Sequence, residues 1–377
     1  MGKYLSDITL ILLGAGNSTR FKNAVKKQWL YIDEEPLWLY VTKKFQKNFS
    51  FKKIIIVSSK EEIKYMKHFA SFDYVQGGET RQASLSNALT KVSSKYVLVS
   101  DIARCCIPKK MIQRILDAKE KASCIVPSLT INDTVYFKNQ PINREEVKII
   151  QTPQLSKTKL LKKALNTHKL FTDDSSAIVS LNKKIHFVRG SKKAHKLTRI
   201  KDLKELSCLK APSSKTLTGF GIDTHPFEEN KEMFLCGVPL KVPYGFKAHS
   251  DGDVAIHAII DALLGAVGLG DIGELYPDNN AMYKNIDSTL LLKDTVSRIT
   301  SFGYCISHID LTIVAQKPKI SPYKDKMRQK LALILGINTH LINIKATTSE
   351  KLGFIGREEG ITAHAIANLN YMNWKNL

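Results

Sequence analysis

Three side chains in the second half of the sequence have the types and spacing of a metal site. Asp223 and His225 lie two residues apart, and side chains at i and i+2 of a strand point to the same face of a sheet. His257 follows the acidic and polar run 249–253 and begins an apolar, helix-like stretch. Two imidazoles and one carboxylate leave one coordination position open, as in catalytic Zn²⁺ sites. The pattern therefore predicts a catalytic zinc site in this half.

A glycine-rich turn follows the first apolar run of the sequence, Ile8–Leu13. Residues 14–18 read Gly-Ala-Gly-Asn-Ser, and glycines after a strand let backbone N–H groups face a phosphate. A dinucleotide-binding fingerprint is an alternative, but Thr19 occupies its third glycine position. Arg20 and Lys27 place two cations close to the turn. These cations favour a polyphosphate ligand.

Two further segments supply groups that a nucleotide or its metal ion would contact. Residues 76–84 form a glycine-led turn into a helix-like stretch. Asp101 ends the buried run Val97–Ser100, at a position where a Mg²⁺ ligand or a sugar contact is expected. The sequence contains no Walker-type phosphate-binding motif.

Together these segments resemble the 2-C-methyl-D-erythritol 4-phosphate cytidylyltransferases from about residue 7 to residue 205. The matching segments are Leu13–Arg20, Lys27-Gln28, Gly77–Ser84, Asp101–Arg104, Thr152-Pro153-Gln154 and Lys196-Leu197-Thr198. The resemblance implies transfer of CMP from CTP to 2-C-methyl-D-erythritol 4-phosphate, with release of pyrophosphate. Such a transfer needs positioning and cations more than covalent catalysis.

The resemblance also implies a role for each matching residue. It assigns the CTP phosphates to Gly14, Ala15, Gly16, Asn17 and Ser18, and the cytidine to Gly78, Glu79 and Ser84. It assigns stabilisation of charge at the α-phosphate to Arg20, Lys27 and Lys196. It assigns the acceptor to Asp101 and Arg104, and, across a dimer, to Thr134 and Arg144. Thr152 is also expected to bind substrate. A Mg²⁺ or Mn²⁺ ion is expected near Asp101.

Three residues near the acceptor segments depart from the family pattern. Lys26 and Cys105 stand where the family has proline, and Ile102 replaces an alanine. These changes leave open an alternative in which nucleotidyl transfer is retained but the acceptor is another polyol phosphate.

The second half is similar to 2-C-methyl-D-erythritol 2,4-cyclodiphosphate synthase from about residue 217 to residue 372. The resemblance implies closure of 4-diphosphocytidyl-2-C-methyl-D-erythritol 2-phosphate into the 2,4-cyclodiphosphate, with release of CMP. It assigns Zn²⁺ to Asp223, His225 and His257, and a second ion, Mg²⁺ or Mn²⁺, to Glu350. It further implies a trimer whose sites lie between subunits.

The remaining residues of this half that match the family are expected to bind substrate. By the resemblance, His249 and Ser250 lie near the reacting phosphate, and Thr348 is catalytic. The other expected contacts are Asp271, Ile272, Gly273, Tyr276, Ala315, Lys319, Ala346, Thr347, Ser349, Phe354 and Arg357, besides the metal ligands Asp223 and His225.

Alternating strand-like and helix-like segments must position these residues in the first half. Strands are expected at Ile8–Leu13, Lys53–Ser58, Tyr96–Ser100, Cys124–Val126 and Ile185–Val188, and helices at Leu37–Phe49, Thr80–Lys91 and Lys109–Lys121. This order predicts an α/β domain with a mostly parallel sheet, which by the resemblance is a Rossmann-like nucleotidyltransferase domain. A polar break separates it from an α+β cyclodiphosphate synthase domain. We expect domains at 1–208 and 217–377, joined by a linker at 209–216.

The net charge of +22 is confined to one half of the chain. Residues 1–210 hold 40 Lys and Arg against 18 Asp and Glu, whereas the remaining residues hold 17 of each. A basic nucleic-acid-binding protein is therefore an alternative, but no zinc-finger, RNP or arginine-rich motif supports it. Attraction of anionic small-molecule substrates explains the charge equally well, and no nucleic-acid partner is expected.

The six cysteines include no C-x-x-C pair, so reduced thiols in a cytoplasmic enzyme are expected. The longest apolar stretches are too short or too polar for a membrane span, so no membrane association is expected. A dimeric first domain fused to a trimeric second one predicts a homo-oligomer that closes as a hexamer.

Overall fold

The computed structural model describes residues 3–16, 18–167, 169–277, 279–283 and 285–376. The chain forms two compact units. The first comprises Met1–Pro212 together with Asn373–Leu377, and the second comprises Ser213–Met372. No helix among the described residues has the length and apolar character needed to cross a membrane.

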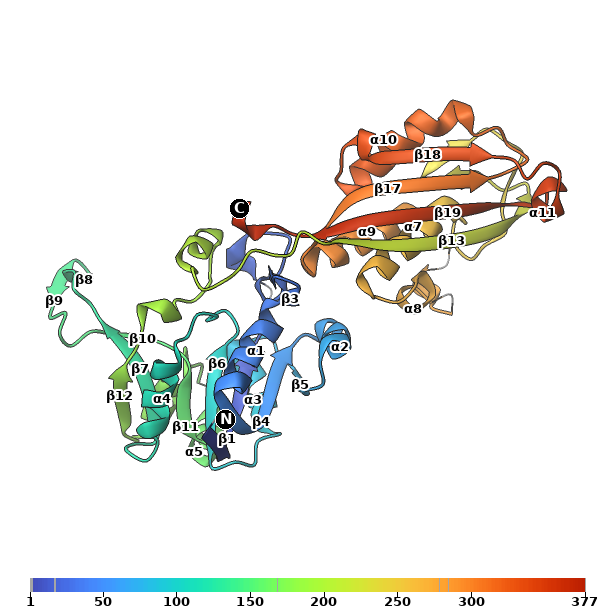
Figure 1. Ribbon diagram of the computed structural model, residues 1–377. Helices are drawn as coiled ribbons and strands as arrows, with labels where there is room; N and C mark the ends of the chain where they lie inside the picture. The colour runs from blue at the N-terminus through green and yellow to red at the C-terminus, as the bar shows by residue number, and fades with distance from the viewer. Residues whose placement is uncertain (1–2, 17, 168, 278, 284, 377) are drawn as a thin grey trace. The chain divides into compact units, whose positions relative to one another are not determined.

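The first unit contains an eight-stranded sheet in the order β10-β7-β11-β6-β1-β4-β5, with β12 paired to β7 (Figure 1). Its strands are β1 (Lys3–Leu13), β4 (Phe49–Ser58), β5 (Asp73–Gln76), β6 (Tyr96–Asp101), β7 (Cys124–Thr130), β10 (Lys148–Ile150), β11 (Gln154–Lys157) and β12 (Ile185–Arg189). β1 pairs in parallel with β4 and β6, as do β4 with β5 and β7 with β12. β10 and β11 are antiparallel to their neighbours. The expected mostly parallel sheet is confirmed, although it is mixed.

Helices bury both faces of this sheet. They are α1 (Leu37–Asn48), α2 (Lys60–Phe69), α3 (Arg81–Leu89), α4 (Lys109–Asp117), α5 (Thr158–Leu165) and α6 (Asp174–Val179). Ile11 and Leu13 of β1 belong to a core cluster with side chains of α3, α5 and α6. Leu10 and Leu12, which point to the opposite face, are also buried. Burial on both faces explains why the strands read as continuous apolar runs.

Two small hairpins and several 3-10 turns complete the first unit. The hairpins pair β2 (Tyr31–Ile32) with β3 (Glu35–Pro36), and β8 (Val135–Phe137) with β9 (Gln140–Ile142). The 3-10 turns are η1 (Thr19–Phe21), η2 (Lys27–Trp29), η3 (Lys192–Ala194), η4 (Ile200–Glu205) and η8 (Trp374–Asn376).

Both chain segments that flank the second unit are bound to the β2–β3 hairpin of the first. The backbone N–H of Asp33 donates to the carbonyl of Ala211 at 3.0 Å. The Trp374 side chain is 1% exposed, and its Nε1–H donates to the carbonyl of Tyr31 at 2.6 Å. The residues after Met372, which we expected in the second domain, thus pack with the first unit.

The second unit has a five-stranded sheet in the order β16-β13-β19-β17-β18. Its strands are β13 (Thr216–Glu229), β16 (Tyr244–Phe246), β17 (Tyr304–Val314), β18 (Ile342–Thr347) and β19 (Gly360–Tyr371), beside a hairpin of β14 (Met233–Leu235) and β15 (Val238–Leu240). Its helices are α7 (Val254–Val267), α8 (Ile272–Leu275), α9 (Ser288–Ser301), α10 (Lys324–Leu335) and α11 (Gly353–Gly356) (Figure 1); short 3-10 turns are η5 (Ala281–Tyr283), η6 (Ser321–Tyr323) and η7 (Thr339–Leu341). This unit confirms the expected α+β class.

Two glycines bring α7 close to the sheet of the second unit. A Cβ at Gly219 of β13 would lie 2.0 Å from the carbonyl oxygen of Ala262, and one at Gly221 would lie 2.1 Å from that of Ala258. Neither Gly219 nor Gly221 can therefore be replaced by a residue with a side chain unless the backbone moves. The close approach places His257 of α7 beside Asp223 and His225 of β13.

Candidate active sites

A cavity of about 470 Å³ lies where β1, β4, β5 and β6 end. These strands are parallel, so their carboxyl ends meet at one edge of the sheet, where ligands bind in folds of this class. The residues expected at a nucleotide site that line the cavity are Gly14, Ala15, Gly16, Ser18, Arg20, Lys27, Gly78, Glu79, Ser84, Asp101 and Lys196. Asn17 lies outside the described residues.

Close backbone packing shapes one wall of this cavity. A Cβ at Gly14 would lie 2.5 Å from Cδ1 of Ile102, and one at Gly77 would lie 2.4 Å from Cβ of Ala15. The Ser84 hydroxyl accepts the N–H of Gly78 at 3.1 Å. The absence of side chains at both glycines therefore keeps this wall open to a flat or extended ligand.

Lys27 lines the cavity together with two other expected cations, Arg20 and Lys196. Lys27 Nζ donates to the carbonyl of Leu197 at 3.3 Å. Burial lowers the pKa of Lys27, and the nearby charges of Lys196 and Arg20 lower it further. An anion placed here would relieve this repulsion, so the cavity is suited to phosphate groups.

Asp101 is the centre of a buried polar network at the end of β6. Lys196 Nζ lies 3.0 Å from its Oδ2, the Thr152 hydroxyl donates to the same oxygen at 3.1 Å, and Arg81 Nε lies 3.6 Å from Oδ1. Burial alone would raise the pKa of Asp101, but Lys196, Arg81 and Arg104 together lower it. The group is therefore held as a carboxylate.

Arg104 and Thr152 lie beside Asp101 and are not among the residues that line the cavity. Arg104 Nε donates to the Thr152 hydroxyl at 2.9 Å, and Nη1 donates to the carbonyl of Ala194 at 2.6 Å. These contacts connect β6 to the segment that carries Lys196.

Thr134 and Arg144 flank the β8–β9 hairpin, which projects from the sheet (Figure 1). Both residues are exposed. Arg144 Nη1 donates to the carbonyl of Asn132 at 2.5 Å, and neither residue lines the nucleotide cavity of its own chain.

Sequence reasoning missed one ion pair at this site. Arg81 lines the cavity, and its Nη1 donates to Oδ1 of Asp174 at 2.9 Å. Asp174 is 1% exposed. Arg81 was visible within the segment 76–84, but no pattern linked it to a partner 93 residues away.

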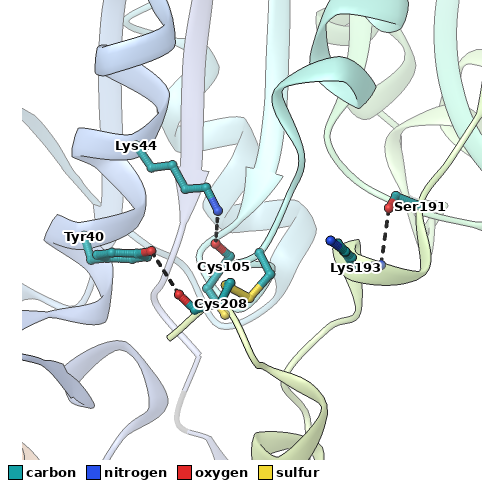
Figure 2. The surroundings of a disulfide bond; sticks show 7 residues. Tyr40, Lys44, Cys105, Ser191, Lys193 and Cys208 are labelled. Atoms are coloured by element: carbon teal, nitrogen blue, oxygen red, sulfur yellow. Dashed lines mark hydrogen bonds between the residues drawn. A yellow bond between two sulfur atoms is a disulfide. The ribbon is translucent and has the colours of Figure 1, made fainter. Parts of the chain in front are cut away.

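The expectation that all thiols are reduced is wrong for one pair. Cys106 and Cys208 form a disulfide, with Cα atoms 5.9 Å apart and a sequence separation of 102 (Figure 2). The N–H of Leu197 donates to the carbonyl of Ala103 at 2.9 Å, so the chain returns to β6 before it reaches Cys208. This tertiary return, which spacing does not reveal, brings the two cysteines together. Cys105, Cys124, Cys236 and Cys305 are free.

The disulfide lies among polar contacts from α1. Lys44 Nζ donates to the carbonyl of Cys105 at 3.1 Å, and the Tyr40 hydroxyl donates to that of Cys208 at 3.5 Å (Figure 2). The loop after Asp101 is thus joined covalently to the end of the first unit and by hydrogen bonds to α1.

Asp223, His225 and His257 form a compact cluster in the second unit, with one ligand atom of each within 4.8 Å of the others. Oδ2 of Asp223 lies 2.8 Å from Nε2 of His225 and 3.0 Å from Nδ1 of His257. Burial would raise the pKa of Asp223, but both imidazoles lower it. A carboxylate oxygen and two ring nitrogens turned to one point fit a zinc ion with an open position.

A cavity of about 320 Å³ adjoins this cluster. The expected residues His249, Ser250, Ile272, Gly273 and Tyr276 line it with the three ligands. Sequence analysis missed the other lining residues, Lys247, Ala248, Asp261, Tyr283, Ile286 and Leu291. Asp271 is not among the lining residues; its carboxylate caps α8 by accepting the N–H of Glu274 at 2.8 Å.

The other expected residues of the second unit lie apart from this cavity. They are Ala315, Lys319, Ala346, Thr347, Thr348, Ser349, Glu350, Phe354 and Arg357, and none of them lines it. The N–H of Ala315 donates to the carbonyl of Thr347 at 2.9 Å, and the Thr348 hydroxyl donates to Oε1 of Glu350 at 2.6 Å. Within the described part of the chain, Glu350 does not join the three-residue metal cluster.

Comparison with known proteins gives matches over both units. Residues 8–208 match the model of the 2-C-methyl-D-erythritol 4-phosphate cytidylyltransferase family, and residues 216–370 match that of the YgbB family. The chain is 66% identical to the bifunctional enzyme IspD/IspF of Sulfurovum sp. (strain NBC37-1), over 98% of this chain and 100% of that protein. It is 54% identical to that of Aliarcobacter butzleri (strain RM4018), over 98% of this chain and 99% of that protein.

A solved structure agrees with both units. The bifunctional IspDF from Campylobacter jejuni matches with a TM-score of 0.92 at 47% identity, over 98% of this chain and 100% of that one. These matches do not favour the nucleic-acid-binding alternative or a different acceptor. The chain belongs to the bifunctional IspD/IspF family of isoprenoid precursor synthesis, with a cytidylyltransferase unit followed by a cyclodiphosphate synthase unit.

Proposed function

We propose that the first unit binds CTP in the cavity at the carboxyl ends of β1, β4, β5 and β6. The observation that carries this proposal is the convergence of Arg20, Lys27 and Lys196 on one cavity beside the glycine-rich turn. The turn that begins at Gly14 would direct backbone N–H groups to the phosphates. Gly78, Glu79 and Ser84, which line the same cavity, would hold the cytidine.

In the transfer step, a phosphate oxygen of 2-C-methyl-D-erythritol 4-phosphate attacks the α-phosphorus of CTP. A new P–O bond forms, the bond to the oxygen that bridges the α- and β-phosphorus breaks, and pyrophosphate leaves. Arg20, Lys27 and Lys196 would stabilise the negative charge on the α-phosphate oxygens. Asp101 would orient Lys196, since the two side chains lie 3.0 Å apart.

Among the described residues that line the cavity, Glu79 and Asp101 are the carboxylates that could hold Mg²⁺ or Mn²⁺. Both oxygens of Asp101 already face donors or cations, so the phosphates of CTP would supply most of the ligands. Such an ion neutralises phosphate charge. Arg104 and Thr152 would orient Asp101, while Thr134 and Arg144 would reach the acceptor of a neighbouring subunit.

In the second unit, Asp223, His225 and His257 would hold Zn²⁺, which supplies Lewis acidity at the β-phosphate. His249 and Ser250 would bind the diphosphate, and Asp271, Ile272, Gly273 and Tyr276 would form the wall around the erythritol. The 2-phosphate of the substrate attacks its own β-phosphorus, the ring closes and CMP leaves. Because both reacting groups belong to one bound molecule, holding them in one cavity accounts for much of the catalysis.

The separate cluster around Thr347, Thr348 and Glu350 supports a site shared between subunits. Thr347 and Glu350 are exposed, and neither lines the zinc-side cavity of its own chain. We propose that they complete the site of a neighbour in a homo-oligomer, with Ala315, Lys319, Ala346, Ser349, Phe354 and Arg357 around the cytidine diphosphate. A dimeric first unit and a trimeric second unit would close as a hexamer. A stable monomer in sedimentation that still cyclises its substrate would refute this arrangement.

One variant in each unit tests the two proposed activities separately. Lys27→Ala should abolish release of pyrophosphate from CTP and 2-C-methyl-D-erythritol 4-phosphate but leave cyclisation intact. His257→Ala should lose bound zinc, measured by elemental analysis of the dialysed protein, and lose cyclisation while transfer continues. A Lys27→Ala protein that transfers CMP at the original rate would contradict the first proposal. A His257→Ala protein that keeps its zinc would contradict the second.

Acceptor choice and location complete the proposal. Assays with other polyol phosphates should give much less product than 2-C-methyl-D-erythritol 4-phosphate. We propose that both reactions take place in the cytoplasm, where CTP is made.

A further inference from the structure

The segment that carries Lys27 is held by a buried carboxylate outside the proposed catalytic set. Glu62 is in the first turn of α2 and is 1% exposed. Its Oε1 accepts Gln28 Nε2–H at 2.7 Å and Trp29 Nε1–H at 2.8 Å. Lys26 Nζ lies 3.5 Å from the same oxygen. One carboxylate oxygen thus contacts the residues on both sides of Lys27.

The second oxygen of Glu62 binds the end of β4 and the start of α2. Oε2 accepts the hydroxyl of Ser58 at 2.8 Å and that of Ser59 at 2.9 Å. Ser59 lines the nucleotide cavity, as does Gln28 on the other side of the carboxylate. Glu62 therefore joins two walls of the cavity through one buried group.

The contacts of Glu62 demand a carboxylate. The amide of Gln28, the indole of Trp29 and the ammonium of Lys26 can only donate in these contacts. A hydrogen-bonded charge in a buried position fixes geometry more firmly than an apolar contact, and its loss leaves several donors unsatisfied. Trp29 also stacks on Tyr65 of α2, with ring centroids 5.1 Å apart, so η2 and α2 form one packed body.

We propose that Glu62 is a positioning residue for cytidylyl transfer, which acts through Gln28 and Trp29 to fix Lys27 at the α-phosphate. The inference rests on the proposed role of Lys27. Lys27 has other restraints as well, among them the Ser18 hydroxyl that accepts its N–H at 3.2 Å and the carbonyl of Leu197. Neither of these two restrains η2 from the α2 side, where the hydrogen bonds to Glu62 add a polar restraint to the stacking of Trp29 on Tyr65.

Glu62→Gln tests the proposal, because it keeps the side-chain shape but removes the charge beside Lys26 and replaces one of the two acceptor oxygens with an NH₂ group. We expect kcat for cytidylyl transfer to fall about 10–100-fold, with a smaller change in KM for CTP and no change in cyclisation by the second unit. Glu61→Gln is the matched control, since Glu61 is the adjacent, exposed carboxylate on the same helix. It should leave both activities unchanged.

A double-mutant cycle separates positioning from a general loss of stability. CTP labelled in its α-phosphate allows residual transfer by Lys27→Ala to be measured. If Glu62 acts through Lys27, adding Glu62→Gln to Lys27→Ala should lower the rate less than twofold further. Equal effects of Glu62→Gln in both backgrounds, or an unchanged kcat in the single variant, would overturn the inference. A fully active Lys27→Ala protein would instead refute the proposed role of Lys27.

Discussion

Truncation of Trp374 should destabilise the first unit, although this residue follows the whole second unit in the sequence. The indole is 1% exposed. It lines a small pocket together with Ile200, Leu203 and Leu206. Its Nε1–H donates to the backbone carbonyl of Tyr31 at 2.6 Å. The variant Trp374→Ala removes both the packing and the hydrogen bond.

The size of the effect follows from burial. Replacing a buried tryptophan with alanine costs about 3–5 kcal/mol in the free energy of unfolding. With a denaturant slope of about 2–3 kcal/mol per molar urea, the unfolding midpoint should fall by about 1–2.5 M. Trp374→Phe retains much of the ring and loses the N–H donor, so its cost should be nearer 1–2 kcal/mol.

Tryptophan fluorescence measures this unit selectively. The three tryptophans of the chain are Trp29, Trp38 and Trp374, and all belong to the first unit. In Trp374→Ala, the remaining two report urea unfolding of the first unit alone. A midpoint lowered by less than about 0.3 M, well short of the expected fall of about 1–2.5 M, would mean that the tail does not pack in solution.

Three further predictions concern the first unit. Reduction of the Cys106–Cys208 disulfide should lower its stability by up to about 4.7 kcal/mol, because the bond closes a loop with a sequence separation of 102; an unchanged urea midpoint with and without dithiothreitol would contradict this. Gly77→Ala should raise KM for CTP in steady-state assays, since the added Cβ would lie 2.4 Å from that of Ala15. Transfer should lose activity as the pH rises and Lys27 loses its proton, and this loss should begin below pH 10.5 because the pKa of Lys27 is lowered from that value. In a pH–rate profile, Lys27→Arg should move the alkaline loss of activity to higher pH.

The turns that follow long strands could be predicted from the sequence much better than short strands could. Contacts between residues far apart in the sequence could not be predicted. Gly14 and Asp101 end apolar runs, and parallel pairing brings such ends together, so their shared cavity could be predicted. β11 has four residues, too few for a periodic pattern. Cys106 and Cys208, like Arg81 and Asp174, meet only because of the tertiary fold, and no local signal marks such pairs.

The β8–β9 hairpin and the cluster around Thr347, Thr348 and Glu350 illustrate a different limit of prediction from sequence. Thr134 and Glu350 were expected at active sites, yet neither lines the nucleotide cavity or the zinc-side cavity of its own chain. Sequence motifs identify residues that act on the same substrate. They do not tell whether one chain or two supply those residues, because assembly depends on surfaces that the motif does not include.

The return of Asn373–Leu377 to the first unit makes the second unit an insertion within the first. During synthesis, the Tyr31 carbonyl and the groove for Trp374 are complete long before their partner is made. The intervening segment, Ser213–Met372, has 160 residues. At about 5–20 residues per second, their synthesis takes roughly 8–32 s. The first unit therefore reaches its final packing only after the second unit has been synthesised, which ties completion of the first fold to translation of the second.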